Sequence, residues 1–150
     1  MDTVFKKINY KDSPSVVVIN SPTSFESNIE AMQNLTTFHR DFSSVEKTDF
    51  IIAFCTKQTE VDTVAMEASK KLEADGLLWF AYPKGTSKKF KCDFKRDTGW
   101  AVLGEQGFEP VRIVAIDEDW SALRFRRVGF IKKMTRSFAI TDEGKKRIEK

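Results

Sequence analysis

The segment that most constrains the fold is residues 77–85, which read LLWFAYPKG. An apolar run that follows an Asp-Gly pair and ends abruptly in Tyr-Pro-Lys-Gly is typical of a strand buried on both faces. Strands of this kind belong to parallel sheets covered by helices, and ligands bind at the carboxyl ends of such strands. The segment therefore predicts an α/β fold and the edge of the sheet at which a site would lie.

Other apolar runs extend this pattern along the chain. Residues 16–20 and 49–54 are rich in β-branched or aromatic side chains and predict two more buried strands. Weaker alternation predicts a strand over residues 35–42. The runs at 109–116 and 121–128 predict two strands joined by an acidic turn.

Three helices are expected between these strands. The first has capping-box spacing between Thr23 and Glu26, and the second takes Thr59 as its N-cap and ends at Gly76. Asp97 is a suitable N-cap for the third. Strands separated by helices form a parallel sheet through right-handed crossovers.

These elements predict an α/β fold of three-layer, Rossmann-like type, with a mostly parallel sheet that ends in a C-terminal antiparallel β-hairpin. The hairpin follows from the tight turn at 117–119, which forces its two strands to run in opposite directions. Residues 6–12 are polar and predict an edge segment. We expect residues 1–128 to form a single domain, and residues 129–150 to form a basic extension that ends in a short helix.

The charge is distributed unevenly along the chain. Residues 124–150 carry a balance of +7, so the remainder carries −4 and the net charge is +3. A basic tail on an acidic body indicates an anionic partner, or a solvated tail that pairs with the body. Cys55 and Cys92 lie in different contexts and predict neither a disulfide framework nor a metal site. No run is long enough to span a membrane, so we expect a cytoplasmic protein without a membrane partner.

Several motifs resemble known families. The pattern DxxxAF at residues 49–54, followed by an Asp-Gly pair and LLWFAYPKG, resembles the second half of class I methyltransferase-like domains. More closely, the chain is similar to a bacterial family of small proteins with no assigned function. The shared motifs are Asn20-Ser21-Pro22, Leu78-Trp79 through Pro83-Lys84, and the hairpin sequence DEDWSALRF at 117–125.

The resemblance implies a Rossmann-like, methyltransferase-like fold without a known activity. A working methyltransferase would have a glycine-rich turn after its first strand, where this chain has Asn-Ser-Pro-Thr at 20–23. Pro22 fixes φ and has no N–H to donate. We therefore expect no cofactor, and a non-catalytic binding or regulatory module on a degenerate methyltransferase-like scaffold.

Candidate ligand-binding residues follow the predicted strands. Asn20 and Ser21 precede a helix N-terminus that could bind an anion, and Tyr82 and Lys84 end the strand at 77–82. The alternatives are simple turn formation by Asn20 and Ser21 and an ordinary loop lysine. Because Asn20 and Lys84 follow strands that share one edge of the sheet, the second functional hypothesis is an enzyme that binds a small anion or a nucleotide there.

The hairpin contributes the densest polar group, which consists of Asp117, Trp120, Ser121 and Arg124. Two carboxylates in the turn are too few to predict a metal. Trp120 could stack on a ligand, or it could cover the core while the aspartates cap backbone N–H groups. His39, the single histidine, is a nominal general base, but no nucleophile accompanies it in sequence.

Bases and aromatic residues interleave from the last strand into the tail. Such a pattern suits RNA or single-stranded DNA, although buried phenylalanines and solvated arginines would give the same pattern. The third hypothesis is therefore a nucleic-acid-binding accessory protein. Its candidate residues are Arg126, Arg127, Lys132, Lys133 and Arg136.

Overall fold

A computed structural model describes residues 1–94 and 98–131 of the 150-residue chain. Its strands form one six-stranded sheet in the order β2-β1-β3-β4-β6-β5. The first four are parallel, and β6 pairs antiparallel with both β4 and β5. This confirms the predicted mostly parallel sheet with a C-terminal antiparallel hairpin. The strands are β1 (Ser15–Ile19), β2 (Thr37–His39), β3 (Thr48–Phe54), β4 (Leu72–Pro83), β5 (Phe108–Ala115) and β6 (Trp120–Arg127).

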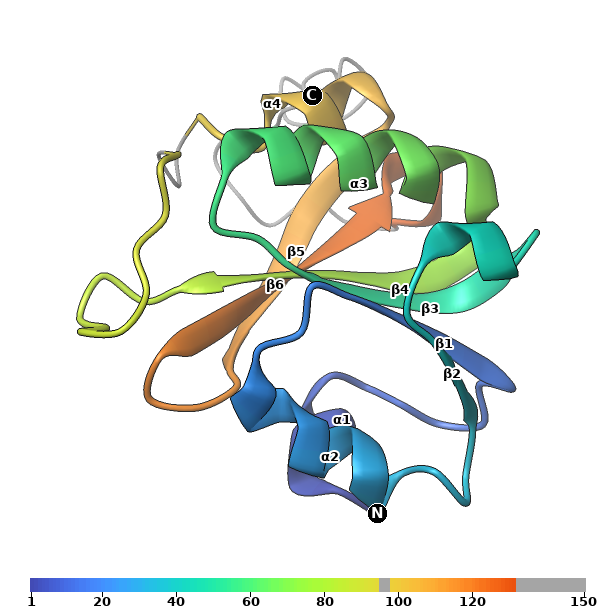
Figure 1. Ribbon diagram of the computed structural model, residues 1–150. Helices are drawn as coiled ribbons and strands as arrows, with labels where there is room; N and C mark the ends of the chain where they lie inside the picture. The colour runs from blue at the N-terminus through green and yellow to red at the C-terminus, as the bar shows by residue number, and fades with distance from the viewer. Residues whose placement is uncertain (95–97, 132–150) are drawn as a thin grey trace.

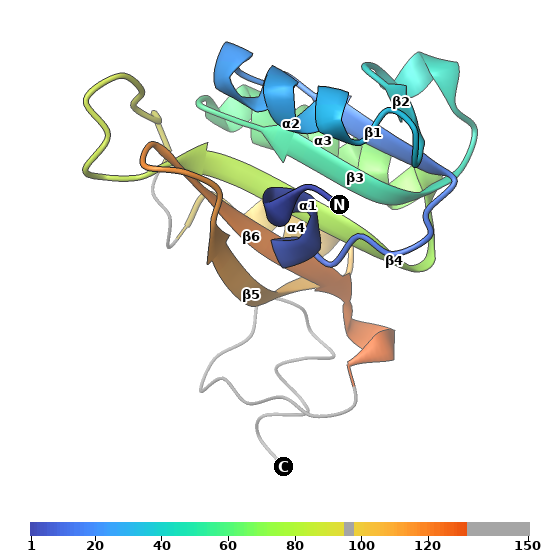
Figure 2. The ribbon, with the colours of Figure 1, turned by 90° about the horizontal axis from the view of Figure 1, so that it is seen from below.

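Helices cover both faces of the sheet, which gives three layers. Helices α3 (Gln58–Lys71) and α4 (Ala101–Glu105) lie on one face, and α1 (Thr3–Lys7) and α2 (Glu26–Ala31) lie on the other (Figure 1). The view from below shows α1 and α2 in front of the strands (Figure 2). No helix within residues 1–94 and 98–131 has the length and apolar character required to cross a bilayer.

Alternating side chains of the central strands fill two separate cores. Phe50 and Trp79 point toward α1 and α2, whereas Ile51 and Phe80 point toward α3 and α4. All four are fully buried. Because the strands are covered on both faces, their sequences are continuous apolar runs rather than alternating ones.

The connection between α3 and β4 differs from the prediction. The helix ends at Lys71 and not at Gly76, and the strand begins at Leu72. The Asp-Gly pair lies inside β4, within an irregularity in its pairing with β3 that falls between Leu72 and Leu77. Asp-Gly therefore marks a bulge in a long strand rather than the end of a helix.

Three further predictions about local structure are wrong. Residues 6–12, predicted as an edge segment, contain no strand, and the first two of them end helix α1. The Asp2 carboxylate caps this helix by accepting hydrogen bonds from Val4 N (3.0 Å) and Phe5 N (3.1 Å). Thr23 does not cap a helix, because it begins the 3₁₀ turn Thr23–Phe25. The Glu26 carboxylate accepts a hydrogen bond from Arg40 instead. The N-cap of α3 is Lys57 rather than Thr59. The predicted strand at 35–42 is reduced to three residues.

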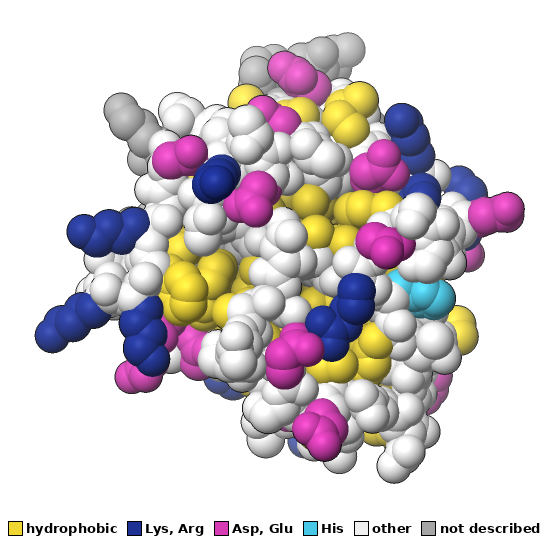
Figure 3. All heavy atoms as spheres, viewed as in Figure 1, with side chains coloured by type: hydrophobic (Ala, Val, Ile, Leu, Met, Phe, Trp, Pro, Cys, Tyr) yellow, Lys and Arg dark blue, Asp and Glu magenta, His cyan; other side chains and the backbone are white. Residues whose placement is uncertain are grey.

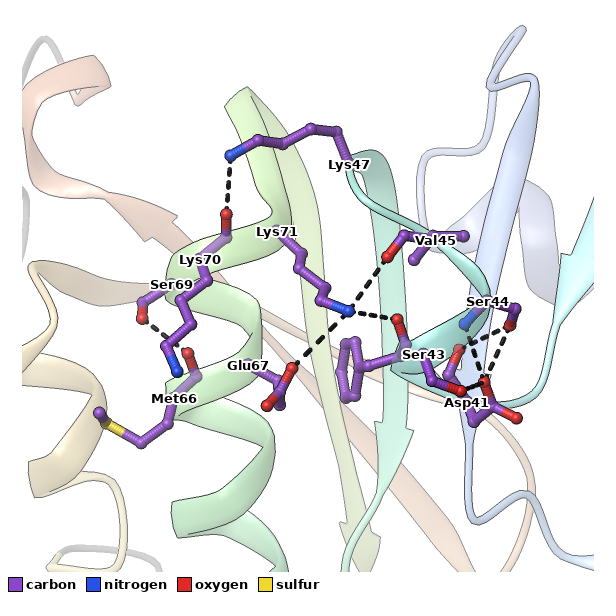
Figure 4. A network of polar contacts seen from close by, with 11 residues as sticks. Asp41, Ser43, Ser44, Val45, Lys47, Met66, Glu67, Ser69, Lys70 and Lys71 are labelled. Carbon is purple, nitrogen blue, oxygen red and sulfur yellow. Dashed lines mark hydrogen bonds and ion pairs between the residues drawn. The ribbon is translucent and has the colours of Figure 1, made fainter.

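The C-terminal end of α3 is tied to the segment after β2 (Figure 4). Lys71 Nζ donates to the carbonyls of Phe42 and Val45 and forms an ion pair with Glu67. Nearby, Lys47 Nζ donates to the Lys70 carbonyl at 2.8 Å. These contacts hold the segment between β2 and β3 against the C-terminal end of α3.

Asp97 and the predicted helix at 141–149 lie outside the described residues. The described chain continues past residue 128 through a 3₁₀ turn, Val128–Phe130, to the buried Ile131. The domain boundary at 128 stays a prediction.

Candidate functional site at the carboxyl edge of the sheet

The turn after β1 is made by an asparagine in the left-handed region. Asn20 has φ 57°, a conformation that glycine adopts freely and that asparagine tolerates better than most residues. The sharp turn that the sequence analysis expected to require glycine is therefore present without one. It directs the chain from β1 into Ser21, Pro22 and the 3₁₀ turn Thr23–Phe25.

A glutamate joins the ends of β1 and β3. Glu60 Oε1 accepts hydrogen bonds from the backbone N–H groups of Thr56 (2.9 Å) and Lys57 (3.1 Å), which fixes the turn between β3 and α3. Its Oε2 accepts a hydrogen bond from Asn20 Nδ2 at 3.2 Å. Since β1 lies between β2 and β3, this is the point at which strand order reverses, the usual ligand position in open α/β sheets.

An ion pair spans the ends of β1 and β2. Arg40 Nη2 lies 2.7 Å from Glu26 Oε1, and Ser21 Oγ donates to Glu26 Oε2, also at 2.7 Å. The hydrogen bonds from Arg40 and Ser21 lower the pKa of Glu26. Asp41, the next residue, accepts hydrogen bonds from the hydroxyls of Ser43 and Ser44, which lower its pKa (Figure 4).

The segment after β4 is fastened to the β5–β6 hairpin. The Lys84 N–H donates to the Asp119 carbonyl at 2.8 Å, and Ser87 Oγ donates to Asp119 Oδ1 at 2.8 Å. Asp117 Oδ1 accepts from the N–H groups of Asp119 (2.8 Å) and Trp120 (2.9 Å), which forms the hairpin turn. Figures 1 and 2 both show this segment beside the hairpin turn.

A pocket of about 390 Å³ opens between these segments. In the view of Figure 3, hydrophobic side chains are visible in the hollows of the surface, and Lys or Arg side chains project at the left margin, on the side of the segment after β4. The pocket thus combines one ammonium, one carboxylate, one aromatic ring and three hydroxyls. Its lining residues are Ser21, Pro22, Thr23, Ser24, Lys89, Phe90 and Asp119.

The predicted ligand-binding residues are placed in three environments. Ser21 lines the pocket, and Asn20 and Lys84 belong to the turns beside it. Tyr82 is buried in the core under α3 and α4, where it packs edge-on against Trp100. The Asp117 carboxylate is held in the hairpin turn.

The remaining hairpin candidates lie on β6. Trp120 is 3% exposed and packs against Phe54 and Phe90, so it forms part of the core. Its indole Nε1 is buried without a hydrogen-bond partner among the described residues. Ser121 pairs with Tyr82 and is partly buried. Burial lowers the pKa of Arg124, and the nearby Arg126 lowers it further.

The candidate nucleic-acid residues within the described part bind other parts of the chain. Arg126 forms a bidentate pair with Asp75 at 2.6 and 2.8 Å. Arg127 donates to the carbonyls of Leu72 and Ala74 and lies over the Phe108 ring. The other three candidates lie outside the described residues: Lys132, Lys133 and Arg136.

Neither cysteine nor histidine joins the pocket lining. Burial raises the pKa of the Cys55 thiol, which disfavours the thiolate, the nucleophilic form. His39 is partly buried on the edge strand β2. Within the described part of the chain, no group of three His, Cys, Asp or Glu side chains could hold a metal.

Sequence reasoning missed four pocket residues: Thr23, Ser24, Lys89 and Phe90. Thr23 was interpreted as a helix cap rather than as part of a pocket wall, and Ser24 was assigned no role. Lys89 and Phe90 lie in a loop whose course depends on Ser87 and Asp119, which are 32 residues apart. One signal was present, since an aromatic residue flanked by lysines in a loop at the carboxyl edge is an unusual arrangement.

Several solved structures with a similar architecture are methyltransferases. A SAM-dependent methyltransferase from Aquifex aeolicus superposes with a TM-score of 0.60 at 12% identity, over 83% of this chain and 88% of that one. The ribosomal protein L11 methylase of Lactobacillus delbrueckii subsp. bulgaricus gives 0.54 at 14% identity, over 83% and 74%. The N-methyltransferase NodS of Bradyrhizobium japonicum WM9, in complex with S-adenosyl-L-homocysteine, gives 0.50 at 14%, over 83% and 82%.

These likenesses define the fold as methyltransferase-like. No family model matches the chain, and its sequence matches no curated protein. The prediction of a non-catalytic module is contradicted by this comparison, because the structures reported above that share the scaffold are methyltransferases. The sharp turn after β1 is nevertheless formed without glycine, because Asn20 adopts the left-handed region.

Proposed function

We propose that this protein is a methyltransferase that uses an S-adenosyl methyl donor. The observation that carries the proposal is the pocket at the carboxyl end of β1, in a fold shared with methyltransferases. It lies where the sharp turn at Asn20 leads into the exposed residues Thr23 and Ser24.

The groups that line the pocket fit such a donor. Its amino-acid portion carries an ammonium and a carboxylate, which match the Asp119 carboxylate and the Lys89 ammonium. Phe90 provides a ring on which the adenine could stack, and the hydroxyls of Ser21 and Ser24 could bind the ribose. When bound, the donor supplies an electrophilic methyl group on a positively charged sulfur.

The residues of the pocket bind and orient the methyl donor, and we assign none of them as a proton acceptor. Asp119 is held by its hydrogen bond from Ser87, so one carboxylate oxygen is fixed in direction while the other can accept from a ligand. Phe90 is held by its contact with Trp120, whose ring centroid lies 5.0 Å away. Positions fixed in this way reduce the entropy lost when a ligand binds.

The resemblance of residues 20–22 and 117–125 to small bacterial proteins remains part of the proposal. The structure gives those motifs a physical role, since Asn20 makes the turn after β1 and Asp117 makes the hairpin turn. Both turns border the pocket.

Isothermal titration of the protein with S-adenosylhomocysteine tests the proposal. We expect saturable binding that Asp119→Asn weakens by roughly 10- to 150-fold, because a hydrogen bond to a charged group contributes about 1.5–3 kcal/mol. Asn keeps an acceptor for Ser87, so the loop remains in place. Lys11→Ala, at the opposite edge of the sheet, serves as the matched control. Absence of binding at millimolar ligand, or equal binding by wild type and Asp119→Asn, would overturn the proposal.

A further inference from the structure

Three arginines lie together on one face of the β5–β6 hairpin. Arg112 and Arg124 are direct partners in the antiparallel pairing, so their side chains leave the same face of the sheet. Arg126 follows on that face, two residues along β6. This is the face that α1 covers, because Arg124 also pairs with Trp79, which belongs to the core under α1 and α2. The three arginines are separate from the residues that line the pocket.

The three guanidiniums differ in their hydrogen bonds. Arg126 donates through Nε and Nη2 to the two carboxylate oxygens of Asp75, at 2.8 and 2.6 Å. Arg124 Nε is buried and has no hydrogen-bond partner among the described residues. Arg112 donates from Nη1 to Asn9 Oδ1 at 3.4 Å, a distance near the limit for a hydrogen bond. Arg112 and Arg124 therefore retain donors that no other described group accepts.

The carboxylates beside the arginines do not balance their charge. Asp75 forms its ion pair with Arg126, and Glu109 is buried opposite Arg126 in the β5–β6 pairing. In the described part of the chain, neither carboxylate forms an ion pair with Arg112 or Arg124. Burial lowers the pKa of Arg124 most, and its neighbours Arg126 and Arg112 lower it further, against an opposing effect of Asp75. Three guanidiniums thus face two carboxylates, and the excess lies at Arg112 and Arg124.

The direct opposition of Arg112 and Arg124 is unfavourable unless an anion lies between them, because like charges opposite one another destabilise a pair of strands. A ligand can reach the pair, since Arg112 is exposed and Arg124 is partly exposed. Figure 2, which looks onto this face, shows α1 beside β5 rather than in front of it. The long contact of Arg112 with Asn9 leaves its side chain able to move when a ligand enters. An oxyanion could then accept from Arg124 Nε, as the Asp75 carboxylate accepts from Arg126 Nε.

We propose that Arg112 and Arg124 form a binding site for a dianionic phosphoryl group, either free phosphate or the terminal phosphate of an organic ligand. Guanidiniums bind phosphate through pairs of N–H groups, and both arginines have donors to offer. Their two positive charges, which no described carboxylate pairs with, match a dianion better than a monoanion. The site lies outside the pocket and does not rest on the proposed methyltransferase activity.

Titration of the full-length protein with inorganic phosphate tests the site, with the ionic strength held constant by sodium chloride. The readout is the set of arginine Nε–H resonances in proton–nitrogen correlation spectra. Arg124 Nε–H should shift saturably at millimolar phosphate, whereas Arg126 Nε–H, already bound to Asp75, should shift much less. No saturable shift of Arg124, or an equal shift when chloride replaces phosphate, would overturn the inference.

A variant of the exposed arginine separates a phosphate site from a general effect of salt. Arg112→Gln should weaken phosphate binding about tenfold or more, because a charge-assisted hydrogen bond is lost. Phosphate should therefore raise the midpoint of thermal unfolding of wild type more than that of Arg112→Gln. Lys70→Gln removes an exposed cation at the end of α3 and is the matched control, which should respond as wild type does. Equal responses of wild type and Arg112→Gln would contradict the site.

Methyl phosphate and dimethyl phosphate identify the source of the phosphoryl group. Methyl phosphate is a dianionic monoester, and dimethyl phosphate is a monoanionic diester. A saturable shift of Arg124 with methyl phosphate supports the terminal phosphate of an organic ligand, and a shift with inorganic phosphate alone supports the free ion. Binding of dimethyl phosphate as tight as that of either dianion would contradict a site for a dianion.

Discussion

At the scale of single residues, Asn20 decides whether the chain can turn at the end of β1. Its φ of 57° is strained for residues with a branched Cβ. Asn20→Val should destabilise the fold by about 1–2 kcal/mol relative to Asn20→Gly, because the left-handed conformation costs about that much for a residue with a side chain. Both variants lose the hydrogen bond to Glu60, so the comparison isolates the backbone conformation.

Urea denaturation of the two variants measures the difference. Equal free energies of unfolding for Asn20→Val and Asn20→Gly would contradict the left-handed turn. They would also remove the argument that this chain needs no glycine after β1.

The ion pair between Glu26 and Arg40 makes a prediction about pH. The folded state lowers the pKa of Glu26, so the pair stabilises the fold above the carboxyl's unfolded pKa. That contribution is lost as the pH falls through the lowered, folded pKa. Because the side chains of Arg40 and Glu26 are 47% and 45% exposed, the contribution should stay below about 1 kcal/mol and diminish in salt.

Carbon-detected NMR titration of Glu26 in wild type and Arg40→Gln measures the effect. The pKa of Glu26 should rise toward its ordinary value in Arg40→Gln. An equal pKa of Glu26 in wild type and Arg40→Gln would show that Arg40 does not lower it.

At the scale of elements, the bulge in β4 depends on Gly76. A Cβ there would lie 2.7 Å from Leu72 Cδ1, 2.9 Å from the Glu73 carbonyl and 3.0 Å from the Asp49 carbonyl. Two of these contacts are with backbone, which cannot move without disturbing the pairing of β3 and β4. Gly76→Ala should therefore destabilise the fold by about 1–3 kcal/mol, as other overpacking changes do.

Gly85→Ala is the control for this change, since a Cβ at Gly85 meets nothing within 4 Å. Its effect on the free energy of unfolding should remain within about 0.5 kcal/mol, measured by thermal and chemical denaturation. A Gly76→Ala protein as stable as Gly85→Ala would show that the bulge relaxes or is placed incorrectly.

The elements that could be predicted were strands whose continuous apolar sequence reflects burial on both faces. Residues 49–54 and 77–82 are strands because buried positions on both faces require apolar side chains throughout. Elements set by tertiary contacts were predicted poorly. Helix α1 depends on its Asp2 cap and its buried Phe5, and β2 is shortened to the three residues that pair with β1.

At the scale of the whole molecule, the edge that holds the site was predictable but the pocket was not. Parallel strands bring Asn20 and Lys84 to the same edge, which requires only their order along the chain. The pocket also requires the loop of residues 84–94 to fold back on the hairpin, and that path depends on the hydrogen bond between Ser87 and Asp119. Such a pair leaves no periodic trace in a single sequence, so Phe90 and Lys89 could not be assigned to the site.

The central claim is that an S-adenosyl donor binds between the turn after β1 and the loop that carries Lys89 and Phe90. A crystal structure of the protein with S-adenosylhomocysteine tests it most directly. We predict ligand density between Ser21–Ser24 and Phe90, with a polar contact to the Asp119 carboxylate. Density for the ligand at any other position, or none under saturating ligand, would contradict the claim.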